Sequence, residues 1–382
     1  MKIAQVAPLV ERVPPELYGG TERVVSYLTE ELVRQGHEVT LFASGDSITA
    51  AELVPCAERA LRLDPAAPPA LPQQLVMLDK VRRRAREFDV IHFHIEYLHF
   101  PLCRHEAWRV MTTLHGRLDL PEVVRFFREF DELPLVSISN SQRAPMPPVN
   151  WAGTVHHGLP VDLYSFNAKP EDYLAFVGRI SPEKRPDRSI EIARRTGLKL
   201  KIAAKVDRAD EAYFHESVRP LLVDPHVEFI GEVGESDKAD LLSKARALLF
   251  PVDWPEPFGL AMIEAMACGT PVIAWRCGSV PEIVAHGVNG YIVATMDEAL
   301  AAVRHIDEVD RARVRGAFEQ RFSAQRMASD YVRIYRRLAA SQELPRRAAG
   351  AHWRAIGPGC AVPLAPSHSV LTGELISALS KR

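Results

Sequence analysis

The sequence has few cysteines, no long apolar run and no glycine-rich dinucleotide fingerprint. Only five of its 382 residues are cysteines; they are widely separated and form no C-x-x-C pair. This spacing excludes a disulfide framework and a zinc ribbon, and it is typical of reduced thiols in the cytoplasm. No apolar run approaches the roughly 18 residues that a membrane-spanning helix needs. Met1 leads directly into a strand-like segment and not into a signal peptide. We therefore expect a cytoplasmic protein, at most peripheral at the inner membrane face.

Positively and negatively charged residues are nearly equal in number. The formal net charge is −2, which argues against a nucleic-acid partner. One local exception is a basic run on a predicted helix over 73–88, formed by Lys80, Arg82, Arg83, Arg84 and Arg86. The favoured interpretation is a solvated helix face. Contact with an anionic membrane or with a substrate is the alternative.

The length and the alternation of patterns predict an α/β protein with two domains. A chain of this length is too long for one hydrophobic core. Apolar strand-like runs alternate with amphipathic helical segments in both halves, which predicts parallel sheets covered by helices on both faces. We expect two Rossmann-like, doubly wound domains, 1–163 and 164–321, facing a central cleft where a ligand binds. Residues 341–382 lose this periodicity and are expected to form a loosely ordered tail.

The stretch from 251 to 274 carries the strongest functional signal. Pro255 and Pro257 flank Glu256 and forbid both helix and sheet, so they hold this carboxylate in a fixed loop. The pattern then becomes helical from Phe258 to Cys268, with Glu264 in the second turn. Such a strand-to-helix junction is where open α/β sheets bind ligands. Two glutamates are therefore predicted to lie at a binding site.

Two further segments could bind an anion. Gly19-Gly20 follows the first predicted strand and precedes a helix, where backbone N–H groups attract a phosphate; an ordinary tight turn is the alternative. Arg179 and Lys184 follow a strand that ends at Gly178, and two cations there could neutralise a pyrophosphate. A solvated basic loop is the alternative interpretation.

Three histidines end or line predicted strands of the first domain. His115 ends one strand beside Gly116 and is expected to face the cleft, whereas His92 and His94 share one face of another strand. A three-histidine metal site is conceivable but weakly supported by this spacing. No D-x-D pair is present to hold a metal-bound diphosphate. The sequence therefore predicts no metal.

These motifs together resemble a known enzyme family. Pro255-Glu256-Pro257-Phe258-Gly259-Leu260, Glu264-Ala265 and Cys268-Gly269-Thr270-Pro271-Val272 resemble the E-x7-E signature of the retaining group 1 glycosyltransferases (glycosyltransferase family four, GT-B fold). Gly178-Arg179 and Pro182-Glu183-Lys184 are similar to the diphosphate loop of that family. Tyr18-Gly19-Gly20-Thr21-Glu22, Leu114-His115-Gly116 and 277–291 match other parts of its pattern. The resemblance covers about residues 1–340 and has the motifs in order.

The resemblance implies a role for each of these residues. Glu256 and His115 would lie at the reacting sugar, and Arg179 and Lys184 would stabilise the leaving diphosphate in place of a metal. Glu264 would hold the ribose hydroxyls. The remaining donor contacts would come from backbone or side chain at Gly19, Gly20, Ile230, Phe258, Gly259 and Leu260. The segment 322–340 resembles the last helix of the family, which crosses back onto the first domain.

The implied reaction is transfer of a hexosyl group from a UDP- or GDP-sugar to an acceptor, with retention of anomeric configuration and without a metal cofactor. Acceptor and oligomeric state are not specified by the sequence. The alternatives are a GT-B nucleotide-sugar 2-epimerase, against which the intact glutamate pair argues, and a non-catalytic nucleotide-sugar-binding protein. A binding protein would lack some of Glu256, Arg179 and Lys184, and all three are present.

Overall fold

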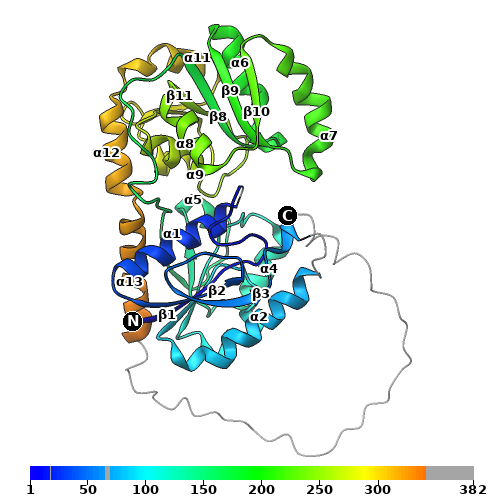
Figure 1. Ribbon diagram of the computed structural model, residues 1–382, viewed down its shortest axis with the longest axis vertical. Helices are drawn as coiled ribbons and strands as arrows, with labels where there is room; N and C mark the ends of the chain where they lie inside the picture. Colours follow the sequence, from blue (N-terminus) through cyan, green and yellow to red (C-terminus); the bar gives the residue numbers. More distant parts are fainter. Residues whose placement is uncertain (18, 65–68, 341–382) are drawn as a thin grey trace, which may run out of the picture. The chain divides into compact units, whose positions relative to one another are not determined.

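The computed structural model describes residues 1–17, 19–64 and 69–340, and residues 1–342 form one compact unit (Figure 1). The predicted tail 341–382 and the motif residue Tyr18 lie outside the described residues. No helix in the described ranges is long and apolar enough to cross a membrane.

The first half of the chain builds a parallel sheet with strand order β3-β2-β1-β4-β5-β6-β7. Its central strands are short and buried on both faces, as helices on both sides of a parallel sheet require. The strands are β1 (Lys2–Val6), β2 (Glu38–Ser44), β3 (Glu52–Ala57), β4 (Val90–Phe93), β5 (Val110–Thr113), β6 (Leu135–Ser137) and β7 (Trp151–Thr154). The α-helices are α1 (Gly20–Arg34), α2 (Ala70–Arg84), α3 (Phe100–Cys103), α4 (Pro121–Glu129) and α5 (Asn140–Arg143).

The second half builds another parallel sheet, with strand order β10-β9-β8-β11-β12-β13. Its strands are β8 (Tyr173–Arg179), β9 (Lys199–Lys205), β10 (Val227–Gly231), β11 (Ala247–Phe250), β12 (Val272–Trp275) and β13 (Gly290–Val293). Its helices are α6 (Pro186–Thr196), α7 (Glu211–Tyr213), α8 (Glu235–Lys244), α9 (Leu260–Ala267), α10 (Val280–Ile283), α11 (Met296–Arg304) and α12 (Arg311–Arg321). The two sheets make the fold a GT-B-type α/β architecture.

The last described helix, α13 (Ala324–Ala340), returns to the first sheet. Its amphipathic pattern buries one face against α1 and β4. On that face the Tyr335 hydroxyl lies 2.8 Å from His92 Nδ1, and the Tyr331 hydroxyl lies 3.0 Å from Thr113 Oγ1. The helix therefore completes the core beneath the first sheet.

Four segments differ from what the sequence indicates. The edge strands β3 and β7 are absent from the sequence prediction because β3 contains Pro55, β7 contains Gly153, and neither has a regular buried face. The segment 210–222 has a helical pattern in the sequence but forms a short α-turn followed by a π-helical turn (Phe214–Val218) and a 3-10 turn (Arg219–Val223). Pro220 lacks the N–H that a continuous α-helix needs there. The helix predicted over 73–88 begins earlier, since α2 starts at Ala70.

Candidate active site

Glu256 lies in a rigid loop between β11 and α9. Its backbone is fixed at both ends, because its N–H donates to Trp254 O (2.7 Å) and its carbonyl accepts from Ser279 N (3.0 Å). Gly278 lies against this backbone with φ +56°, and a Cβ there would come within 2.3 Å of Glu256 N. Only glycine fits such an approach at positive φ. The loop conformation predicted from the two prolines is thus held by a second loop, 276–279.

The Glu256 carboxylate is ion-paired with Lys184, and both side chains are largely buried. Trp254 Nε1 also donates to Glu256 Oε2 (2.8 Å). Lys184 comes from the 3-10 turn Pro182–Lys184 that follows β8, next to β11 in the sheet. The structure therefore brings together the acid and one cation that the sequence placed 72 residues apart. The contact from Trp254 was not predicted, although it stands only two residues before Glu256.

Arg179, the second predicted cation, is held by a different set of groups. Its guanidinium pairs with Glu183 (3.2 Å) and Asp207 (3.4 Å), and lies 3.9 Å from Asp210. These acids stabilise the arginine at the carboxyl end of β8 without a ligand. An anion that binds there would compete with carboxylates for the guanidinium donors.

Glu264 lies in α9 with its carboxylate almost fully buried, and it accepts a hydrogen bond from Lys238 Nζ (2.6 Å). Lys238 also lies 3.4 Å from Glu235, which is ion-paired with Arg23 of α1. Burial lowers the pKa of Lys238, and the Glu264 charge opposes that shift. A series of ion pairs through Lys238 and Glu235 therefore connects Glu264 to Arg23 of the first domain. No periodic pattern or motif in the sequence indicated Lys238, Glu235 or Arg23.

The turn between Glu256 and α9 presents backbone groups to solvent-accessible space. Gly259 has φ +84°, and a Cβ there would lie 2.7 Å from Met262 Cε and 2.8 Å from Phe250 Cζ. The first N–H groups of any α-helix have no partner within the helix, so they can bind an oxygen ligand. From the other domain, Gly20 approaches so closely that its Cβ would lie 3.6 Å from Leu260 Cδ1. The structure therefore brings two of the predicted donor contacts, Gly20 and Leu260, together across the two domains.

His115 belongs to a buried polar network of the first domain. His115 Nε2 lies 2.9 Å from His94 Nδ1, and His94 Nε2 lies 2.8 Å from Gln5 Oε1. Because the amide oxygen can only accept, His94 carries its proton on Nε2, and His115 then donates from Nε2 to His94. Burial lowers the pKa of His115 to about 3. The ring is therefore neutral at physiological pH.

His92 and His94 use both ring nitrogens within the protein. His92 contacts Tyr335 and Thr113, whereas His94 contacts Gln5 and His115. In the described ranges no group of three or more His, Cys, Asp or Glu residues is arranged to hold a metal ion. Metal independence of the reaction stays a prediction.

Two other predicted features lie at the surface. Ile230, expected to line the base, is at the end of β10 and is 41% exposed. In the basic run of α2, Arg84 pairs with Glu52 and Glu87, Arg83 pairs with Asp79, and Lys80 donates to Pro55 O. These contacts favour the solvated helix face predicted for that run.

Two family models match this chain. The model described as "Glycosyl transferases group 1" matches residues 165–319, which include Arg179, Lys184, Glu256 and Glu264. The model described as "Glycosyltransferase Family 4" matches residues 18–147, which include Gly19, Gly20 and His115. The first match contains every strand of the second sheet, and the second match contains β2 to β6 of the first sheet.

Named relatives and solved structures agree with these matches. A D-inositol 3-phosphate glycosyltransferase of Saccharomonospora viridis is 34% identical over 44% of this chain and 43% of the relative. The N-acetyl-alpha-D-glucosaminyl L-malate synthase of Bacillus anthracis is 24% identical over 83% of this chain and 93% of the relative. The crystal structure of AviGT4, a glycosyltransferase involved in avilamycin A biosynthesis, superposes with a TM-score of 0.68 at 26% identity, over 89% of this chain and 98% of that one.

Proposed function

This chain belongs to the group 1 glycosyltransferases, and we propose that it transfers a hexosyl group from a nucleotide-diphosphate sugar to a hydroxyl acceptor with retention of anomeric configuration. UDP- and GDP-sugars are the proposed donor classes. The observation that carries the proposal is the buried Lys184–Glu256 ion pair at the carboxyl ends of β8 and β11. It places a cation and a carboxylate together where open parallel sheets bind ligands.

Departure of the diphosphate is the step that most needs protein charge. The bond between the anomeric carbon and the diphosphate oxygen breaks, and its electron pair leaves with the phosphate. Lys184 and Arg179 would offset the growing negative charge, and the N–H groups at Gly19 and Gly20 would add to this effect from the start of α1. In this proposal the two cations take the place of a metal ion.

The sugar becomes positively charged as the diphosphate leaves. The Glu256 carboxylate would stabilise this oxocarbenium-like state, while the N–H groups of Phe258, Gly259 and Leu260 would orient the sugar hydroxyls. The acceptor oxygen then bonds to the anomeric carbon and its hydroxyl proton is released. Retention is compatible with front-face attack and with double displacement. His115 is neutral, so it would contribute a hydrogen bond to the sugar or to the transferred oxygen and not a charge.

The nucleoside would be held by Glu264 and Ile230. A carboxylate can accept hydrogen bonds from both ribose hydroxyls, and the exposed Ile230 side chain offers an apolar surface to a base. The names of two relatives specify an inositol phosphate and malate. Small hydroxyl-bearing anions are therefore the first acceptors to test.

The proposed location is the cytoplasm, where nucleotide sugars and reduced thiols coexist. Cys56, Cys103, Cys268 and Cys277 are free thiols, in agreement with a reducing compartment. Peripheral membrane contact through α2 is the alternative that its basic residues leave open.

The test is a donor panel followed by product stereochemistry. UDP-glucose, UDP-N-acetylglucosamine, GDP-mannose and the free nucleotides are screened by thermal shift, and the best donor is incubated with inositol 3-phosphate, malate and simple glycosides. NMR of the product should show the anomeric configuration of the donor. An inverted product would refute retention, and conversion of UDP-N-acetylglucosamine to UDP-N-acetylmannosamine without an acceptor would favour the epimerase.

A further inference from the structure

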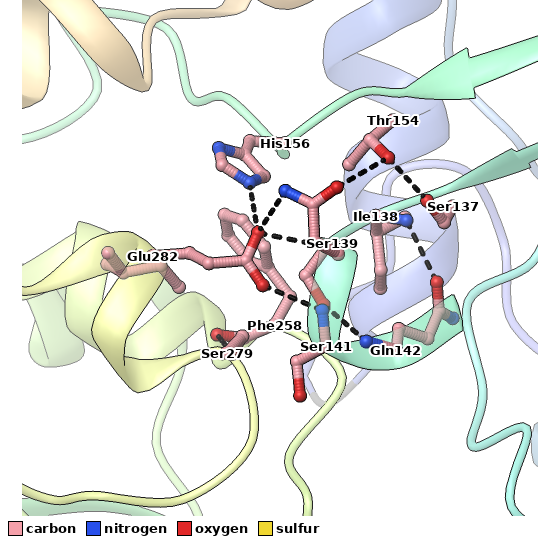
Figure 2. Close-up of polar contacts among 12 residues, drawn as sticks. Ser137, Ile138, Ser139, Ser141, Gln142, Thr154, His156, Phe258, Ser279 and Glu282 are labelled. Atoms are coloured by element: carbon pink, nitrogen blue, oxygen red, sulfur yellow. Dashed lines mark hydrogen bonds and ion pairs between the residues drawn. The ribbon is translucent and has the colours of Figure 1, made fainter. Parts of the chain in front are cut away.

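The short helix α5 joins the two parts of the proposed active site (Figure 2). Ser139 precedes this helix and is fully buried. Its hydroxyl accepts from Gln142 N (2.9 Å), which caps α5, and donates to Pro257 O (2.7 Å) in the donor loop of the other domain. One side chain therefore fixes the start of α5 and the residue that follows Glu256.

Glu282, in α10 of the second domain, makes a denser contact with the same helix. Its carboxylate accepts from Asn140 N (2.9 Å), Asn140 Nδ2 (3.1 Å), Ser141 N (2.8 Å) and His156 Nε2 (3.1 Å). Figure 2 shows these donors converging on one carboxylate. Burial would raise the pKa of Glu282, but the hydrogen bonds from His156 and from the two backbone N–H groups lower it to about 2. The group is thus charged, and it accepts from two N–H groups at the start of α5 that have no partner within the helix.

On its other side, α5 is attached to the turn that carries His115. The Gln142 amide donates to Leu114 O (2.8 Å) and to Gly116 O (2.8 Å), the two residues that flank His115. Gln142 Oε1 accepts from Ile138 N (2.9 Å), so the amide orientation is fixed. A displacement of α5 would therefore displace His115.

The segment around Glu282 is attached to the donor loop as well. Ser279 N donates to Glu256 O (3.0 Å), and Ser279 Oγ donates to Phe258 O (2.7 Å). Ser139 Oγ donates to Pro257 O, which lies between these two carbonyls. The carbonyl oxygens of three successive residues, 256, 257 and 258, therefore all accept a hydrogen bond. Glu256 and His115 are thus linked through α5 by a short series of buried hydrogen bonds.

We propose that Ser139 and Glu282 are positioning residues. Through α5 they keep the turn that carries His115 in one domain at a fixed position relative to the Glu256 loop of the other. Neither residue needs to touch the substrate. This inference rests on the proposed function, because register between these two parts matters only if both act on one sugar. A misplacement of about 1 Å between reacting groups can cost on the order of a hundredfold in rate.

The test compares Glu282→Gln and Ser139→Ala with matched controls. Glu298→Gln removes another helix-capping carboxylate, which accepts from Ala294 N (2.7 Å) away from the donor loop. Ser329→Ala removes an exposed hydroxyl that donates to Gln325 O. The measurements are nucleotide release from the donor that the wild type uses best, with water as acceptor, and the dissociation constant of the free nucleotide.

We expect each of the two variants to lower kcat by about tenfold or more, with nucleotide affinity changed less than about threefold, since the nucleotide contacts lie elsewhere. The double variant should resemble the worse single variant, because both act through α5. The control variants should retain wild-type kcat. Unchanged kcat in both test variants would overturn the proposal. A parallel loss of nucleotide affinity would also overturn it, since it would indicate general damage to the donor domain.

Amide hydrogen exchange tests the link without turnover. Glu282→Gln should increase exchange at residues 114–116 and 138–142, whereas Glu298→Gln should leave both segments unchanged. Absence of this increase would contradict the link through α5 even if the protein proves to be inactive with every donor. Inactivity of the wild type with the full donor panel would instead count against the proposed function.

Discussion

At the scale of single residues, the ion pair of Lys184 and Glu256 joins two opposite charges whose side chains are largely buried. The ammonium also lies 5.3 Å from the centre of the Trp254 ring and 5.8 Å from that of Phe250. Aromatic surroundings of this kind reduce screening and strengthen the electrostatic effect of the cation. The pair is therefore suited to stabilise charge that develops on a substrate.

Removal of the cation should reduce turnover strongly. We expect Lys184→Ala to lower kcat by about a hundredfold or more, because the proposed donor site loses one of its two cations and Glu256 loses its partner. Steady-state nucleotide release measures this effect. Lys169→Ala, which removes an exposed lysine of the same domain, is the control. Turnover near that of the wild type in Lys184→Ala would contradict the role of the pair.

Glu264 should act on binding and not on chemistry. Glu264→Ala removes the proposed ribose acceptor and leaves Lys238 without this partner, so the donor KM should rise by about tenfold or more, while kcat changes little. Initial rates over a range of donor concentrations separate the two constants. A collapsed kcat at an unchanged KM would show that the carboxylate serves the reaction itself.

The sequence predicted individual site residues better than their partners. Glu256 and Lys184 stand in recognisable local motifs, so both could be named without a structure. Arg23 and Glu235, in contrast, are 212 residues apart and have no local pattern that indicates their ion pair. Glu282 lies in a segment that resembles the family, but only the fold reveals that its carboxylate meets α5.

At the scale of elements, the loop 276–279 decides where the Glu256 loop lies. Gly278→Ala should greatly reduce kcat, because its Cβ would clash with the backbone of Glu256. Gly287→Ala is a matched control: Gly287 also has positive φ (+78°), but no atom lies within 4 Å of its Cβ position. Both variants should lose about 1 kcal/mol of stability from the left-handed conformation. Only Gly278→Ala should lose turnover, and equal kcat in the two variants would contradict the support role of the loop.

The predictability of an element depended on its position in a sheet. Central strands such as β11 and β12 are buried on both faces and read as continuous apolar runs. The edge strands β3 and β7 are only partly buried and contain proline or glycine, so their pairing comes from the neighbouring strand and not from their own composition. The segment 210–222 resembles a helix by periodicity, but its geometry changes from α to π at Phe214 and to 3-10 at Arg219, next to Pro220.

At the scale of the whole molecule, buried neutral histidines should make stability depend on pH. Burial lowers the pKa of His92, His94, His99 and His157, as it does for His115. The unfolded chain therefore binds more protons than the folded chain below pH about 6.5, and stability falls as the pH decreases. Each such histidine contributes a slope of at most about 1.4 kcal/mol per pH unit. Glu22, with its pKa raised by burial to about 7, opposes this trend by one proton between pH 7 and about 4.5.

Chemical denaturation between pH 7 and pH 5 measures this dependence. We expect the free energy of unfolding to fall across the range, and the slope to decrease in His99→Gln, which removes one buried imidazole. His105→Gln, at an exposed position, should keep the slope of the wild type. A stability that does not change between pH 7 and pH 5 would contradict the neutral state of these histidines.

The architecture of the whole molecule was largely predictable, because the alternation of strand and helix patterns predicts parallel sheets in both halves. The contacts between the two halves could not be predicted from the sequence. Arg23 with Glu235, Ser139 with Pro257 and Glu282 with α5 join residues far apart in the sequence, and such pairs arise only after the domains fold.

Release of nucleotide from a donor panel by the wild type and by Glu256→Gln tests the central claim most directly. Glu256→Gln keeps the size of the side chain and removes its charge, so folding and nucleotide binding should persist. We predict that the wild type releases UDP or GDP from at least one UDP- or GDP-sugar and that Glu256→Gln is slower by about a hundredfold or more with that donor. Equal rates for the two proteins, or no release from any donor by the folded wild type, would contradict the assignment of Glu256 to a glycosyl-transfer site.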